Sequence, residues 1–121
     1  MKINDKVEIL FDEGLDSFNT DEYDRAIKLF SRVLMIDPDH PDARYYIALS
    51  WANKGNFNKA LSEFTKALEK NPHDTDALIG RGEAWRSKGN IKNALIDFKK
   101  ALGMDPNNAD YKKLVFDLEE K

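Results

Sequence analysis

The sequence has no cysteine and only two histidines, His40 and His73. Without cysteine there can be no disulfide, no thiolate nucleophile and no thiolate ligand for zinc. Both histidines lie next to proline in turn-like segments, where we expect them to cap helices or face solvent. There is also no glycine-rich phosphate loop. We therefore predict that the protein is not an enzyme and needs no cofactor or metal, and a small hydrolase is the disfavoured alternative.

Long apolar runs and a basic excess are also missing. No apolar run approaches the roughly 20 residues that a membrane-spanning helix needs, and residues 1–6 contain no apolar core of signal-peptide length. The chain carries 19 basic and 22 acidic residues, for a net charge of −3. Because nucleic acids are usually bound by basic faces, we expect no nucleic-acid partner. We also expect a soluble, cytoplasmic protein that does not bind membranes.

Three of the four prolines are evenly spaced: Pro38, Pro72 and Pro106 lie 34 residues apart. Each ends a similar phrase, Ile-Asp-Pro, Lys-Asn-Pro or Met-Asp-Pro. A fixed period of this length is typical of a stacked repeat protein, and 121 residues suffice for one domain. We therefore divide a single domain, residues 1–121, into repeats 7–40, 41–74 and 75–108 and a capping helix over 109–121.

Apolar residues within each repeat recur at intervals of three and four, which predicts two helices per repeat. A break falls at Gly55 and at Gly89, each followed by an asparagine that can cap the next helix. Pro41 stands at a predicted first helical position, where its missing N–H group costs nothing. The predicted all-α fold has about seven helices, over residues 5–19, 22–36, 41–53, 57–69, 75–87, 91–103 and 109–119.

Equivalent positions of the repeats carry equivalent side chains. One column is phenylalanine throughout, at Phe30, Phe64 and Phe98, and another contains very small residues, at Gly14, Ala48 and Gly82. A side chain larger than alanine would separate two closely packed helices. We therefore expect the small column at close helix contacts and the phenylalanine column in the space between layers.

These columns resemble those of the tetratricopeptide repeat (TPR) family over residues 7–108. The residues that carry the resemblance are Trp51, Gly55, Phe57, Ala60, Phe64, Ala67 and Pro72 in repeat two, and Gly82, Trp85, Gly89, Ala94, Phe98, Ala101 and Pro106 in repeat three. Repeat one departs from the pattern at Ser17, where the other repeats have tryptophan. Glu13 and Arg81 depart too, in a column that is usually leucine. The resemblance implies a right-handed α-solenoid of antiparallel helix pairs, in which the first helix of each pair lines a concave groove that binds peptides or helices of other proteins.

Residues on the first helices are therefore the candidate groove lining. Apolar members of these columns can instead pack only helix to helix. The acidic column Glu8, Asp42, Asp76 and Asp110 can either complement the helix dipoles or select a basic partner. Glu83 and Arg86, three residues apart, can form a surface pair. The predicted peptide-binding residues are Phe11, Leu15, Asn19, Asp42, Tyr45, Leu49, Asn53, Asp76, Ile79, Glu83 and Arg86.

Some members of this family grip the acidic C-terminal tails of chaperones with a clamp of lysine, asparagine and arginine. At the matching positions this chain has Phe11, Leu15, Tyr46, Asp76 and Gly80, which supply no positive charge. We therefore predict that it does not bind such tails. The sequence predicts a non-catalytic interaction module or scaffold for a protein or peptide with apolar and basic residues, and the alternative is a self-associating structural module. A monomer or a weak homo-oligomer is compatible with both.

Overall fold

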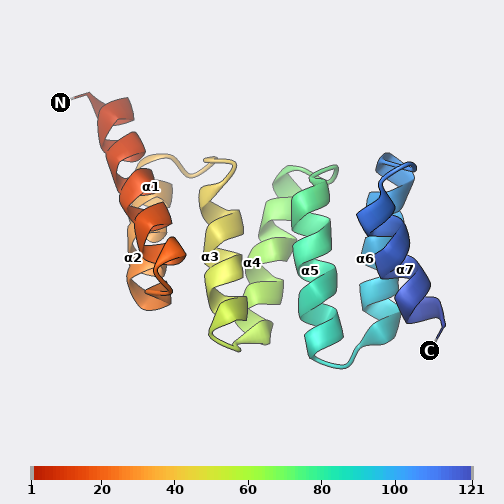
Figure 1. Cartoon of the computed structure of the whole chain (residues 1–121). Helices are drawn as coiled ribbons and strands as arrows, with labels where there is room; N and C mark the ends of the chain where they lie inside the picture. Colours follow the sequence, from red (N-terminus) through yellow and green to blue (C-terminus); the bar gives the residue numbers. More distant parts are fainter. Residues whose placement is uncertain (1, 121) are drawn as a thin grey trace.

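A computed structural model describes residues 2–120, and within them it contains seven helices and no strand. Figure 1 shows these helices side by side in a row, with the two termini at opposite ends. Each helix packs against the next one along the chain. The predicted all-α solenoid is confirmed. The helices are α1 (Ile3–Asn19), α2 (Tyr23–Ile36), α3 (Ala43–Asn53), α4 (Phe57–Lys70), α5 (Thr75–Ser87), α6 (Ile91–Met104) and α7 (Ala109–Glu119).

The turns inside the helix pairs follow the sequence signals. Gly55 and Gly89 adopt φ angles of 84° and 85°, in the left-handed region that a residue without Cβ enters at no steric cost. Between α1 and α2 there is no glycine, and Asp21 takes the same region with φ 63°. After each glycine an asparagine caps the next helix: the side chain of Asn56 accepts from the backbone N–H of Lys59, and that of Asn90 accepts from the N–H of Asn93.

The turns between pairs are capped by side chains at equivalent positions. Asp74 and Asn108 accept hydrogen bonds from the first turns of α5 and α7. His40 does the same for α3, since its Nδ1 accepts from the backbone N–H of Ala43 at 3.1 Å. The prediction that Pro41 begins the third helix is wrong: Pro41 lies in a turn, and α3 begins at Ala43. The first helix begins at Ile3, two residues before the predicted start.

A phenylalanine ring from the second helix of each pair fills the core. Phe30, Phe64 and Phe98 are completely buried. A Cβ atom added to Gly14 would lie 2.6 Å from the Phe30 ring, and one added to Gly82 would lie 2.4 Å from the Phe98 ring. Contacts that short do not occur, so the helices can approach this closely only because those positions lack a side chain. Very small residues in this column therefore leave the space that the phenylalanine ring of the same pair occupies.

One buried ion pair was not predicted. Asp97 on α6 is 2% exposed, and its two carboxylate oxygens accept from Nε and Nη2 of Arg81, both at 2.8 Å. Arg81 also approaches the hydroxyl of Thr65 at 3.4 Å. The arginine that departs from the leucine pattern therefore has a partner on the second helix of its own pair. A similar pair joins Arg44 and Glu63 at 2.9 Å.

No helix within residues 2–120 combines the length and the apolar character needed to cross a membrane.

Replacing Asp97 with alanine should lower the free energy of unfolding by about 3–5 kcal/mol, because it leaves the Arg81 guanidinium without its partner. Replacing both residues with leucine should restore most of that loss or exceed wild-type stability. Urea unfolding followed by circular dichroism measures both. The exposed pair Lys113–Asp117 supplies the control, since Asp117→Ala should cost less than about 1 kcal/mol. Equal losses for Asp97→Ala and Asp117→Ala would contradict the role assigned to this pair.

Candidate functional site

The space between α1 and α3 is filled by the chain's own aromatic side chains. The Tyr46 ring stacks on Phe30, with centroids 5.5 Å apart and planes at 21°. Phe11 and Phe18 approach the same tyrosine at 5.9 and 5.4 Å. Phe11 also lies 4.8 Å from the His40 ring. These rings therefore belong to the core that α1 and α2 share with α3.

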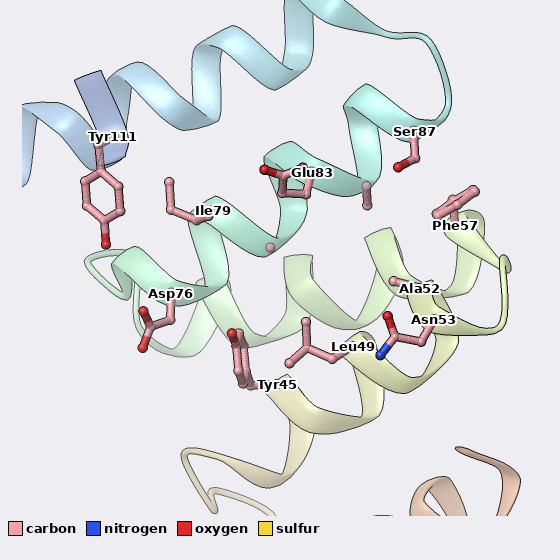
Figure 2. A pocket seen from close by; sticks show the side chains of 12 residues that line it. Tyr45, Leu49, Ala52, Asn53, Phe57, Asp76, Ile79, Glu83, Ser87 and Tyr111 are labelled. Atoms are coloured by element: carbon pink, nitrogen blue, oxygen red, sulfur yellow. The ribbon is translucent and has the colours of Figure 1, made fainter. Parts of the chain in front are cut away.

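An open groove lies one step further along, between α3 and α5. Its volume is about 360 Å³, and Figure 2 shows the side chains around it. We call it the α3–α5 groove. Most of its lining comes from the first helices of two neighbouring pairs, as the sequence predicts, with one residue each from α4 and α7. The lining residues are Tyr45, Leu49, Ala52, Asn53, Phe57, Asp76, Ile79, Gly80, Glu83, Ala84, Ser87 and Tyr111.

Gly80 explains why the groove is open here and closed between α1 and α3. It occupies the position on α5 that Tyr46 occupies on α3, 34 residues earlier. Tyr46 covers Phe30 with its ring, whereas a Cβ atom on Gly80 would already lie 2.5 Å from the Phe64 ring. Phe64 is therefore covered by the Gly80 backbone and by the edge of Tyr45, at a centroid distance of 6.0 Å. Gly80 therefore lines the groove with its backbone alone and adds no ring of its own there.

The two ends of the groove differ in chemistry. Tyr45, Asp76 and Tyr111 lie at one end, and Asn53 and Ser87 lie at the other (Figure 2). The first end has aromatic rings and a carboxylate, and the second has uncharged polar groups. The floor between them is apolar. Such a surface can hold a peptide side chain by contact and can select its charge at one end.

The charge of the lining is negative. Asp76 and Glu83 line the groove, and among residues 2–120 no lysine or arginine does. Glu83 forms an ion pair with Arg86, three residues further along α5, as predicted. Burial raises the pKa of Tyr45 to about 12, and the charge of Asp76 adds to this effect. Within residues 2–120, no group of three histidine, aspartate or glutamate side chains could hold a metal ion.

Six of the predicted peptide-binding residues line the groove, and five do not. Phe11 and Leu15 pack against the first core cluster. Asn19 is exposed at the end of α1, and Asp42 is exposed at the start of α3. The Arg86 guanidinium lies 5.9 Å from the centre of the Phe98 ring. The six that the structure brings together are Tyr45, Leu49, Asn53, Asp76, Ile79 and Glu83.

Sequence reasoning missed Tyr111 and Gly80 as lining residues. Tyr111 occupies the column of Ala43 and Ala77, both completely buried. A bulky residue in a column that is buried alanine in the two preceding pairs is a signal that could have been used. Gly80 replaces an aromatic residue of the preceding repeat, and that difference was also visible. The sequence did not show how this difference shapes the groove, since that depends on where the Phe64 ring lies.

Two family models described as tetratricopeptide repeat match the chain, one over residues 17–81 and the other over residues 52–115. No curated protein sequence matches it significantly.

Solved structures of similar fold cover nearly the whole chain. The Arabidopsis OM64 TPR domain superposes with a TM-score of 0.90 at 20% identity, over 98% of both chains. The second TPR domain of human RPAP3, in complex with the HSP70 peptide SGPTIEEVD, gives 0.88 at 21% identity, over 99% of this chain and 100% of that one. The TPR2B domain of yeast Sti1, in complex with an HSP70 peptide, gives 0.86 at 21%, over 95% and 97%. At these identities the likeness shows the fold.

Stability should fall as the pH rises from about 10 to about 12. The unfolded chain loses the Tyr45 proton near pH 10, whereas the folded chain holds it until about pH 12, so the folded state binds more protons in this window. Titration of tyrosinate absorbance, compared between wild type and Tyr45→Phe, isolates this group. The Asp76→Asn variant should lower the Tyr45 midpoint. A midpoint near 10 in the wild type would contradict the burial of this hydroxyl.

Proposed function

The chain belongs to the tetratricopeptide repeat family, and we propose that it is a non-catalytic protein-interaction module whose α3–α5 groove binds a peptide or helix of a partner protein. The observation that carries this proposal is the contrast between the two halves of the concave side. Tyr46 and its aromatic neighbours fill one half, and Gly80 leaves the other open. Apolar contact with Leu49 and Ile79 supplies the main attraction.

The partner differs in charge from those of the similar structures. The RPAP3 and Sti1 domains are complexed with HSP70 peptides, one of which ends in Glu-Glu-Val-Asp. The α3–α5 groove offers such a tail the carboxylates of Asp76 and Glu83, and within the part of the chain that the structure describes no lysine or arginine lines it. Like charges facing each other oppose binding. We therefore propose that the groove rejects acidic tails and accepts a segment with apolar and basic residues.

Truncating the apolar floor should remove binding and leave the fold intact. Peptides selected from a random display library on the wild-type chain should bind the Leu49→Ala/Ile79→Ala variant at least about tenfold more weakly, since each contact side chain of this kind is worth about 1 kcal/mol or more. Tyr45 is left unchanged because its ring packs against Phe64. Fluorescence anisotropy gives the dissociation constants, and circular dichroism confirms that the variant is folded.

The matched control for this experiment is Ile96→Ala. Ile96 is an exposed isoleucine on α6, 56% accessible, and it is not a lining residue of the groove. This variant should bind the selected peptides as the wild type does. A library that yields no peptide able to distinguish the groove variant from this control would refute the proposed function.

Self-association is a second candidate function, favoured by apolar side chains at the N-terminal edge. Met35 is 83% exposed, Ile3 68%, Ile9 44% and Ile36 38%. Three of them (Ile9, Met35 and Ile36) line a hollow of about 500 Å³ between α1 and α2. A second copy of the chain could cover this edge and bury them.

If the chain self-associates through this edge, its weight-average sedimentation coefficient should rise with concentration. The substitution Met35→Lys should abolish the rise, because a buried charge without a partner opposes the contact. A strictly monomeric chain at the highest concentration tested would exclude this function.

A further inference from the structure

We infer that one end of the α3–α5 groove is a subsite for an arginine side chain of the bound segment, formed by Tyr45, Asp76 and Tyr111. This inference rests on the proposed function, because it specifies what the groove binds. The three side chains come from three helices, α3, α5 and α7, and they lie together at one end of the groove (Figure 2).

The first support is a carboxylate without a cation. Asp76 lines the groove and is exposed, and among residues 2–120 no hydrogen bond or ion pair engages its side chain. The other lining carboxylate, Glu83, already pairs with Arg86. A bound cation would therefore find a carboxylate without a counter-ion at Asp76, whereas the Glu83 carboxylate is already neutralised by Arg86. This difference places the positive charge of the ligand at the Asp76 end.

The second support is the negative electrostatic potential at the Tyr45 hydroxyl. After burial, the negative charge of Asp76 is the next cause that raises the pKa of this tyrosine, and Asp74 and Tyr111 contribute as well. These groups are therefore near enough to act on one another. A cation bound between them would be attracted by Asp74 and Asp76 together.

The third support is the pair of aromatic walls. The Tyr45 ring is held by edge contacts with Phe64 at 6.0 Å and with Tyr46 at 5.4 Å. Tyr111 lies in the first turn of α7, where the Asn108 side chain accepts from its backbone N–H at 3.0 Å. The Tyr45 ring is thus positioned before a ligand arrives, and Tyr111 is partly buried against the same core cluster as Tyr45. A guanidinium fits such a site better than an ammonium does, because it is planar, stacks on aromatic rings and can pair with a carboxylate through two hydrogen bonds.

The groove also sets the length of the bound segment. Asp76 and Ser87 are eleven residues apart on α5, which corresponds to about 16 Å at 1.5 Å per residue. An extended peptide covers that distance with about five residues. The predicted ligand is therefore a short extended segment with arginine at one end and an apolar residue in the middle. The apolar residue would rest on Leu49, Ile79 and the backbone of Gly80, which form the floor.

The inference is tested by repeating the peptide selection on two variants, Asp76→Asn and Asp110→Asn. Asp110 is the matched control: it occupies the same column in the first turn of α7, is likewise exposed, and does not line the groove. Both substitutions remove the same favourable charge from a helix N-terminus. Peptides selected on the wild type and on Asp110→Asn should contain arginine, and those selected on Asp76→Asn should have lost that preference.

A double-mutant cycle on the tightest peptide measures the contact itself. Changing its arginine to citrulline, which keeps the shape and removes the charge, should weaken binding to the wild type about tenfold, as expected for a hydrogen bond between charged groups. The same change should matter less than about twofold on Asp76→Asn and about tenfold on Asp110→Asn. The HSP70 peptide SGPTIEEVD should not compete for the site.

Each other outcome overturns the inference. Selected peptides that are sensitive to Leu49→Ala/Ile79→Ala but contain no arginine would leave the proposed function standing and remove the arginine subsite. The same holds if citrulline costs as much on Asp76→Asn as on the wild type. Competition by SGPTIEEVD would remove the arginine subsite together with the proposed rejection of acidic tails, and would leave only the groove as a peptide site. A library that yields no groove-dependent peptide at all removes both proposals together.

Discussion

The structure depends on a steric fit between one large and one very small side chain in each helix pair. A phenylalanine ring on the second helix occupies the volume that a side chain on the first helix would need, and the distances at Gly14 and Gly82 leave no room for even a methyl group. This fit sets how closely the helices of a pair approach. It also places the core between the two helices of a pair, so that the concave surfaces of the first helices remain available for other uses.

The use of the concave surface differs along the chain because one position differs. Where the second pair has Tyr46, an aromatic cluster closes the space above Phe30; where the third pair has Gly80, the equivalent space stays open. The terminal helix α7 then adds Tyr111 at the edge of that space. A repeat framework that is nearly uniform in its core thus acquires an open groove between its second and third pairs. The carboxylates that line the groove make it negatively charged, whereas an acidic ligand requires a positively charged site.

The sequence predicted most of the fold, since proline spacing, glycine turns and apolar periodicity are local signals. It also predicted six of the twelve groove-lining residues, because the first helices of successive pairs lie on the same side of the array. It left open whether Phe11 and Leu15 line the groove or pack helix to helix, and it could not decide, since their packing against the core depends on where the Tyr46 ring lies. The Arg81–Asp97 pair was missed for a similar reason: its members are sixteen residues apart on different helices, and no periodicity connects them.

We expect that a partner peptide binds in the open groove above Gly80, between α3 and α5. An isotope-filtered nuclear Overhauser spectrum of the labelled chain, saturated with its tightest selected peptide, tests it most directly. We expect contacts from the peptide to the methyl groups of Leu49 and Ile79. Contacts to the methyl groups of Ile3, Ile9 and Met35 at the N-terminal edge, with none in the groove, would contradict it.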